Sequence, residues 1–240
     1  MFAKILFILA GVLIVSFLYS LYTLQREIAF SHTLAMNTVA YQKQSTDMTT
    51  TVLVLGDSTA VGVGATRPED SVPALFAEMV GATYVENRGV SGARVGDLAS
   101  QLMKKNLIEY DYILVMIGGN DVVARYDPQV VSQELRLLLE KLPSHQKLIV
   151  QMCGDVGTAP LLPWYVRSYY TKKNLAFHKA FETTVTEFGG IYVNLYLPKT
   201  EDPFVAQPEI YFSADGFHPS SAGYASWFEI LKAGQFLQED

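Results

Sequence analysis

Short apolar runs alternate with amphipathic stretches along most of this chain. Runs typical of β-strands fall at 51–55, 83–86, 112–117, 148–153 and 191–195. Stretches with helical spacing fall at 72–80, 95–108, 128–142, 170–188 and 221–236, with Ser71 and Asp127 as expected N-caps. Because right-handed crossovers place a helix over the sheet each time, this alternation predicts an α/β fold with a five-stranded parallel sheet covered on both faces.

The amino-terminal pattern is different. Residues 5–24 carry no charge, and as a helix they would rise about 30 Å, which matches the hydrocarbon core of a bilayer. Tyr19 and Tyr22 stand near the far end of this run, and Lys4 precedes it. By the positive-inside tendency, the pattern predicts a single-pass membrane protein whose following domain is periplasmic or otherwise extracytoplasmic.

Three segments follow from this reading. Residues 1–25 are expected to form one transmembrane helix that anchors the protein, residues 26–50 a juxtamembrane linker, and residues 51–240 a single globular domain. A cleaved signal peptide is the alternative, but its apolar region is shorter and ends at small residues, which are absent here.

Composition excludes several classes of protein. Half of the residues are hydrophobic and 18% are charged, which favours a packed domain over a disordered chain. The formal charge of −6 and the absence of a Lys/Arg cluster argue against a nucleic-acid partner. Cys153 is the single cysteine, so no disulfide within the chain is possible, and we expect it as a buried residue at a strand end. The sequence does not specify an oligomeric state.

Residues that could take part in a reaction cluster where strands are expected to end. Four segments stand out: Gly56-Asp57-Ser58, Gly89-Val90-Ser91-Gly92, Gly118-Gly119-Asn120-Asp121 and Asp215-Gly216-Phe217-His218-Pro219. The carboxyl ends of parallel strands meet at one edge of a sheet, where ligands bind in such folds. We therefore expect one pocket to collect all four segments.

These segments hold the components of a serine nucleophile. A serine hydroxyl needs a base to remove its proton, and a histidine oriented by a carboxylate supplies one. Ser58, His218 and Asp215 fit those catalytic roles, with Asp215 three residues before His218. The backbone N–H groups of Ser58 and Gly92 and the amide of Asn120 are candidate donors of an oxyanion hole.

In these motifs the chain from about residue 52 to 231 resembles the SGNH, or GDSL, hydrolase superfamily. All four blocks of that family occur in order, on Ser58, on Gly92, on Asn120 and on Asp215 with His218. Thr59 stands where the name of the family has leucine. The resemblance implies a flavodoxin-like three-layer α/β/α sandwich and hydrolysis of esters or thioesters without a cofactor.

Other motifs are read as structural. The stretch at 62–67 lacks the third glycine of a dinucleotide loop, and there is no Gly-x-Ser-x-Gly elbow at Ser58, so neither nucleotide binding nor an α/β-hydrolase fold is favoured. The remaining histidines, His32, His145 and His178, have no partner at ligand spacing, so they are expected in linkers or on helix surfaces, and no metal is predicted. Asp57 and Asp121 are expected to hold turns.

The substrate is the open question. Trp164 and Tyr165 lie in an aromatic, proline-rich segment expected to be a loop, where they are candidates for a substrate-binding wall. An apolar cleft close to a membrane favours an esterase acting on a lipid, a lysophospholipid or another acyl ester. The alternatives are a carbohydrate O-acetyl esterase or acyltransferase acting on cell-envelope glycans, and an inactive membrane-tethered binding module.

Overall fold

The central sheet is built from five parallel strands. The computed structural model describes residues 2–103 and 109–234, with the backbone alone described at 2–10, 12, 13, 16, 21 and 24. The strands are β1 (Thr51–Gly56), β2 (Tyr84–Asn87), β3 (Glu109–Met116), β4 (Ser144–Met152) and β5 (Ile191–Asn194). Their order is β2-β1-β3-β4-β5, and every pairing is parallel, which confirms the predicted five-stranded sheet.

Strand β1 shows why the apolar runs become central strands. Its side chains alternate between the faces of the sheet, so Val52 and Val54 join one hydrophobic cluster and Leu53 and Leu55 join the other. All four are fully buried, and each such side chain contributes about 1.5–3 kcal/mol through transfer from water. A strand buried on both faces needs a helical layer on each side.

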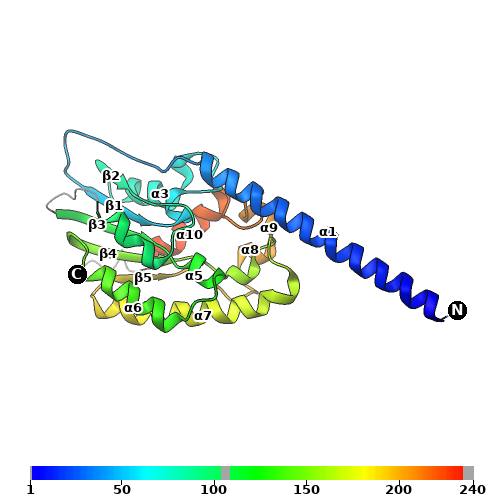
Figure 1. The fold of residues 1–240 in the computed structure, drawn as a ribbon. Coiled ribbons are helices and arrows are strands. Elements are labelled where there is room, and N and C mark those ends of the chain that lie inside the picture. Colours follow the sequence, from blue (N-terminus) through cyan, green and yellow to red (C-terminus); the bar gives the residue numbers. More distant parts are fainter. Residues whose placement is uncertain (1, 104–108, 235–240) are drawn as a thin grey trace.

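The two helical layers are visible in Figure 1. One face of the sheet is covered by α4 (Leu98–Gln101), α5 (Gly119–Val123), α6 (Pro128–Leu139) and α7 (Trp164–Glu187). The other is covered mainly by α3 (Val72–Met79) and α10 (Ser221–Ala233), with the short helices α2 (Ser58–Val61), α8 (Pro203–Ala206) and α9 (Pro208–Tyr211) near the strand ends. The result is the three-layer α/β/α arrangement expected from the sequence.

Helix starts follow the predicted caps. The side chain of Ser71 accepts a hydrogen bond from Ala74 N at the start of α3, and that of Asp127 accepts one from Gln129 N at the start of α6. Each satisfies a backbone donor that the helix itself leaves free. Both predicted N-caps are therefore confirmed.

Some predicted boundaries are wrong. Helix α7 begins at Trp164, six residues before the expected start, because this aromatic segment continues the helical turn after Pro163 instead of forming a loop. The helix expected at 95–108 is present as the 3₁₀ turn η2 (Val95–Asp97) and the single turn α4, and its last part, 104–108, lies outside the described residues.

The amino-terminal segment forms one long helix, α1 (Phe2–Asn37), which projects from the domain (Figure 1). The predicted transmembrane span at 5–24 falls within it, but many of its side chains lie outside the described residues. Among the described residues, no helix is long and apolar enough to cross a membrane.

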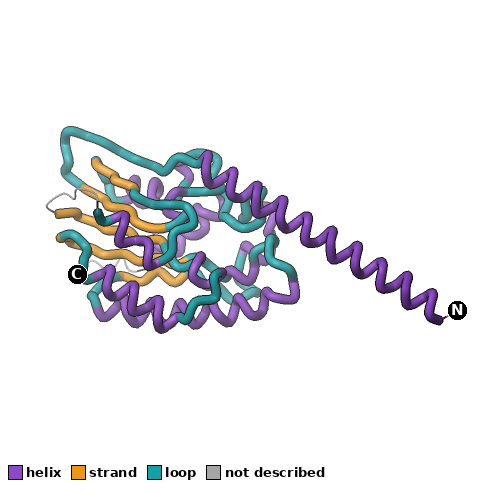
Figure 2. The backbone as a smooth tube through the Cα atoms, in the orientation of Figure 1, coloured by secondary structure: helices purple, strands orange, loops and turns teal. Residues whose placement is uncertain are grey.

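The chain between α1 and β1 adds to the edge of the sheet. Backbone hydrogen bonds join Lys43 and Val85 in an antiparallel bridge, with N···O distances of 3.1 and 2.8 Å. The Lys43 ammonium also donates to the carbonyl of Ala82, and Thr49 N donates to the hydroxyl of Thr83. Figure 2 shows this segment as a loop that leaves the end of α1 and runs along the domain. The expected linker at 26–50 thus makes specific contacts with the sheet.

Candidate active site

Ser58 lies at the carboxyl end of β1, the strand at which the order of the sheet reverses. Gly56 ends the strand with φ 149°, and a Cβ there would lie 2.0 Å from the carbonyl oxygen of Met116. Only glycine therefore allows β1 to turn this closely past β3. Asp57 then caps α2 by accepting hydrogen bonds from the N–H and hydroxyl of Thr59, as expected for a turn-holding residue. Ser58 follows as the first residue of α2 and is buried.

His218 and Asp215 reach Ser58 from the loop before α10. The loop is closed by a bridge between Phe212 and Pro219 and by a hydrogen bond from Ser213 N to His218 O. His218 Nε2 lies 2.8 Å from Ser58 Oγ, and His218 Nδ1 lies 2.6 Å from Asp215 Oδ2. The three side chains form one continuous line of hydrogen bonds.

The carboxylate of Asp215 determines the direction of these bonds. Its Oδ1 accepts from the hydroxyl of Ser213 and from the backbone N–H groups of Phe217 and His218. Burial would raise the pKa of Asp215, but hydrogen bonds and the charge from His218, with the two backbone donors, hold that pKa well below its usual range. An ionised carboxylate only accepts hydrogen bonds, so His218 Nδ1 carries the proton and Nε2 is free to accept from Ser58.

The expected oxyanion donors lie around the same point. Ser58, Gly92 and Asn120 all border one groove together with His218. Asn120 Nδ2 donates one hydrogen bond, 2.9 Å long, to the carbonyl of Ala93, which fixes the orientation of the amide. An amide NH₂ has a second hydrogen. Gly92 has φ 83°, and the position its Cβ would take is open, so its backbone faces free space.

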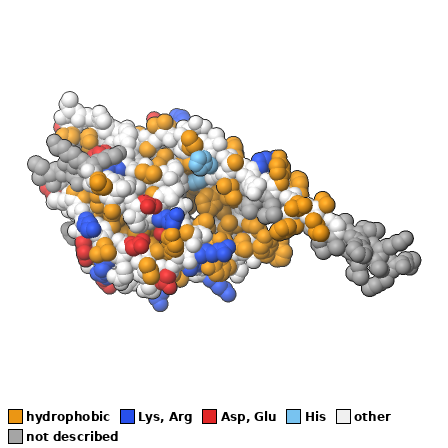
Figure 3. Space-filling view, viewed as in Figure 1, with side chains coloured by type: hydrophobic (Ala, Val, Ile, Leu, Met, Phe, Trp, Pro, Cys, Tyr) orange, Lys and Arg blue, Asp and Glu red, His pale blue; other side chains and the backbone are white. Residues whose placement is uncertain are grey.

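Two cavities meet at Ser58 and His218. The smaller, of about 60 Å³, is lined largely by apolar side chains, among them Phe204, Phe212 and Trp227. The larger is an open groove of about 1030 Å³, bordered on one side by α1 and on the other by residues 161–163, 165 and 166. Figure 3 shows hydrophobic side chains gathered where α1 meets the domain. An ester bound at Ser58 therefore finds apolar space in two directions.

With this geometry in view, comparison with known proteins decides the family. Residues 54–226, more than half of the chain, match the model of the GDSL-like lipase/acylhydrolase family. The chain belongs to this family. A GDSL-like esterase of Mycobacterium tuberculosis is 28% identical to it over 192 residues, which cover 75% of this chain and 60% of that protein. The match thus spans less than two thirds of the length of this curated relative.

Solved structures share the fold of this GDSL-family chain. A phospholipase A1 from Streptomyces albidoflavus has a TM-score of 0.53 at 16% identity and covers 77% of this chain and 99% of its own. A variant of an acetyl-xylooligosaccharide esterase from Geobacillus has a TM-score of 0.56 at 22% identity. The match covers 81% of this chain and 98% of that protein. Both similarities concern the fold.

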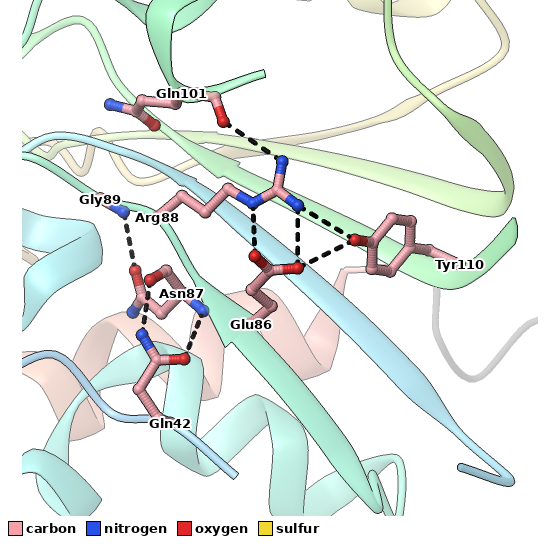
Figure 4. Close-up of polar contacts among 7 residues, drawn as sticks. All are labelled: Gln42, Glu86, Asn87, Arg88, Gly89, Gln101 and Tyr110. Atoms are coloured by element: carbon pink, nitrogen blue, oxygen red, sulfur yellow. Dashed lines mark hydrogen bonds and ion pairs between the residues drawn. The ribbon is translucent and has the colours of Figure 1, made fainter. Parts of the chain in front are cut away.

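The GDSL-family site rests on a buried polar network that sequence reasoning missed. In Figure 4 the guanidinium of Arg88 makes two 2.8 Å contacts with the carboxylate of Glu86, and the Tyr110 hydroxyl donates to that carboxylate. Arg88 also donates to the carbonyl of Gln101. The side chain of Gln101 then holds both backbone groups of Gly56, at 2.9 and 2.8 Å. The network therefore fixes the end of β1 two residues before Ser58.

A second support runs through Asn87. Its side chain donates to the carbonyl of Ala60 in α2 and accepts from Gly89 N. Its backbone is in turn held by Gln42, whose side chain donates to Asn87 O at 2.6 Å and accepts from Asn87 N at 3.0 Å (Figure 4). No local motif marks Gln42, Asn87 or Gln101, because the contacts that join them to other elements reach 27 to 45 residues along the chain.

The structure places the two aromatic residues predicted for the substrate-binding wall differently. Tyr165 borders the larger groove, whereas Trp164 is 81% exposed and, among the described residues, lines neither of the two cavities. Asp121 accepts from Val95 N, as expected for a turn-holding residue, and burial raises its pKa to about 7. Asp155 accepts from Gly157 N and from the hydroxyl of Thr171, and it also lines the smaller cavity.

Two further expectations are corrected. His178 is not on a helix surface: it is buried on α7, 2.6 Å from the Tyr192 hydroxyl, and burial lowers its pKa to about 4. Its apolar neighbours on α7 placed it in the helical face that covers the sheet. Cys153 directly follows β4 as expected but is only partly buried, because it also borders the smaller cavity.

Proposed function

We propose that this chain is a serine hydrolase that cleaves carboxylic esters through an acyl-enzyme formed on Ser58. The observation that carries the proposal is the unbroken line Ser58 Oγ, His218 Nε2, His218 Nδ1, Asp215 Oδ2, with separations of 2.8 and 2.6 Å. Membership of a lipase and acylhydrolase family is consistent with it.

The reaction divides into two transfers. Ser58 Oγ attacks the ester carbonyl carbon while its proton passes to His218 Nε2, and the imidazolium is stabilised by Asp215. The negative oxygen of the tetrahedral intermediate is placed to accept from the N–H groups of Ser58 and Gly92 and from the Asn120 amide. His218 then gives its proton to the leaving alcohol as the ester bond breaks, leaving an acyl group on Ser58.

Water completes the cycle. It attacks the acyl carbon, gives a proton to His218 and releases the carboxylic acid when the bond to Ser58 Oγ breaks. The same proton then returns from His218 to Ser58. No step needs a cofactor or a metal ion, because His218 serves as base and acid in turn.

A lipid-like ester is the substrate class we favour. Apolar side chains dominate both cavities that meet at Ser58, and a largely apolar pocket with few polar groups suits an acyl chain. A protein with the same fold is named a phospholipase A1, and by that name it acts on such an ester.

A carbohydrate O-acetyl esterase or acyltransferase is the second candidate. The small cavity beside Ser58 has room for a short acyl group, and one structural relative is named an acetyl-xylooligosaccharide esterase. Release of acetate from acetylated glycans without activity on longer acyl esters would favour it. Transfer of the acyl group to a sugar acceptor would distinguish a transferase.

The deciding experiment is active-site labelling of the full chain with a fluorophosphonate, with the adduct located by peptide mass spectrometry. We expect labelling at Ser58 that is lost in Ser58→Ala and in His218→Ala, and a fall in ester hydrolysis of about 10⁴-fold or more in Ser58→Ala. Ser100→Ala, a change of an exposed serine on α4, is the matched control and should label normally. Absence of labelling in folded protein would favour an inactive binding module.

The location of the enzyme stays a prediction from the amino-terminal sequence. We propose that the catalytic domain lies outside the cytoplasm and that residues 1–25 attach it to the membrane. Reporter fusions active on only one side of the membrane, placed after residue 234, test this orientation. Recovery of the full chain in the soluble fraction would contradict the attachment.

A further inference from the structure

One wall of the groove at Ser58 comes from helix α1. Residues 28, 31, 32, 35 and 36 of α1 border the groove, and this i, i+3, i+4, i+7, i+8 spacing places them on a single face of the helix. Ser58 and His218 border the same groove. The helix lies outside residues 54–226, the part that matches the family model, so this wall is an addition to the family domain.

The α1 face presents Ile28, Ala35 and Met36 beside the polar Ser31 and His32, and it is not filled by the domain. Ile28 is 52% exposed and Met36 is 74% exposed, although both face the groove. The opposite wall is also largely apolar, with Leu161, Tyr165 and Val166. At about 1030 Å³, the groove is at the upper end of the size of small-molecule sites. It offers apolar side chains on both walls, with an open space between them and polar groups such as Ser31 and His32 among them.

The end of α1 cannot move far from the groove. Gln42 holds the backbone of Asn87 by two hydrogen bonds, and Lys43 pairs with Val85 on the edge of the sheet (Figure 4 shows the Gln42 contact). Only residues 38–41 separate these contacts from Asn37, the last residue of α1, and the five steps of extended chain from Asn37 to Gln42 span at most about 18 Å. The side chain of Asn87 in turn donates to the carbonyl of Ala60 in α2. The α1 wall and the nucleophile are thus held by a shared residue.

We propose that residues 28–36 of α1 form one side of a subsite for the acyl chain of the substrate, so that the enzyme prefers esters of medium-length or longer fatty acids. This inference rests on the proposed function, because it places the ester carbonyl at Ser58. A chain that leaves this carbonyl along the groove covers Ile28 and Met36 on one side and Tyr165 and Val166 on the other. The apolar surface that it removes from water favours binding in proportion to chain length.

The test compares acyl chain lengths in the full chain. Ala35→Trp places an indole in the groove, and Thr33→Trp places the same group on an exposed position of α1 outside the groove lining. We would measure kcat/KM for p-nitrophenyl acetate, hexanoate and decanoate, all below their aggregation limits, with circular dichroism as a check of folding. Met36→Ser, at an exposed position where loss of folding is not expected, removes part of the apolar wall without blocking it.

We expect Ala35→Trp to lower kcat/KM for the decanoate about tenfold or more, to change the acetate value less than about twofold, and Thr33→Trp to match the wild type on every ester. Met36→Ser should lower the decanoate value about threefold. Equal effects of Ala35→Trp on acetate and decanoate, or no effect of Ala35→Trp and Met36→Ser on either, would overturn the subsite while leaving the esterase intact. A wild type that neither hydrolyses any of these esters nor reacts with a fluorophosphonate would overturn the proposed function itself, and the subsite with it.

Discussion

Gln101 holds Gly56 at both of its backbone groups: Gln101 Oε1 accepts from Gly56 N at 2.9 Å, and Gln101 Nε2 donates to Gly56 O at 2.8 Å. The contact is buried and lies two residues before Ser58. A side chain on α4 thereby fixes the turn that presents the nucleophile.

Removal of this side chain should affect both stability and rate. Gln101→Leu has a similar volume but leaves the buried Gly56 N–H without its acceptor, which should lower the free energy of unfolding by about 1–3 kcal/mol. A displaced turn should lower kcat by about tenfold or more with little change in KM. Urea denaturation and steady-state kinetics measure the two effects. Gln101→Glu keeps the acceptor for Gly56 N but sets a second acceptor against Gly56 O in a buried site, so it should also lower stability at pH 7. An unchanged kcat in Gln101→Leu would contradict a positioning role.

Replacement of Asp215 by asparagine should stop His218 from acting as the base for Ser58 while leaving the loop before α10 folded. The amide nitrogen of Asp215→Asn would face His218 Nδ1, so the imidazole proton moves to Nε2, which then cannot accept the proton of Ser58. We expect kcat to fall by about 10²–10⁴-fold. Fluorophosphonate labelling at Ser58 should fall in parallel. Full labelling in this variant would show that His218 does not depend on Asp215.

The same substitution should change the response of stability to acid. The folded-state pKa of Asp215 is depressed, so its contribution to stability is present above the pKa of an unfolded aspartate, about 4, and is lost as the pH falls toward the lower folded-state value. The wild type should therefore lose more stability than Asp215→Asn between pH 5 and strong acid. Urea denaturation of both proteins across this range measures the difference, and parallel curves would contradict it.

Asp121 should have the opposite effect on the pH dependence of stability, because its contribution is lost as the pH rises. Burial raises its pKa to about 7. The hydrogen bond from Val95 N–H lowers this pKa, and the negative charges of Asp57 and Glu134 raise it. A group with a raised folded-state pKa stabilises the protein most below the unfolded value and loses that contribution as the pH rises toward the folded value. From pH 5 to pH 8, the stability of Asp121→Asn relative to the wild type should increase by on the order of 2 kcal/mol. A difference that is constant with pH would show that Asp121 is ionised throughout.

Cys153 should be a poor nucleophile in the native protein. Burial, followed by the negative charges of Asp57 and Asp155, raises the pKa of its thiol far above the usual value, and the thiolate is the reactive form. At pH 8, iodoacetamide should label Cys153 more slowly in native protein than in protein unfolded in urea. Comparable rates, measured by mass spectrometry, would contradict this environment.

The amino-acid sequence by itself determined most helices and strands and the contacts between residues that are close along the chain. Apolar runs such as 51–55 favour buried strands because they are short and end at a Gly-Asp-Ser turn, and a strand that is apolar on both faces needs a helical layer on each side. Asp215 and His218 lie three residues apart, so their contact is local and could be predicted from the order of residues. Caps such as Asp127 are local for the same reason. The loop predicted at the aromatic start of α7 is wrong, because Pro and aromatic residues favour a loop there only weakly and the helix begins at Trp164.

Tertiary structure alone decided the contacts between distant segments. Ser58 and His218 are 160 positions apart, and the Gln101 and Gln42 side chains bond partners 45 positions away, so only the packed sheet brings them together. The position of α1 beside the groove was decided in the same way. The helical spacing of residues 28–36 follows from the sequence, but the surface that faces them depends on how Gln42 and Lys43 pair with the edge of β2. A periodic pattern specifies which face of a helix is apolar, whereas the loops and strand edges that hold the helix specify what that face covers.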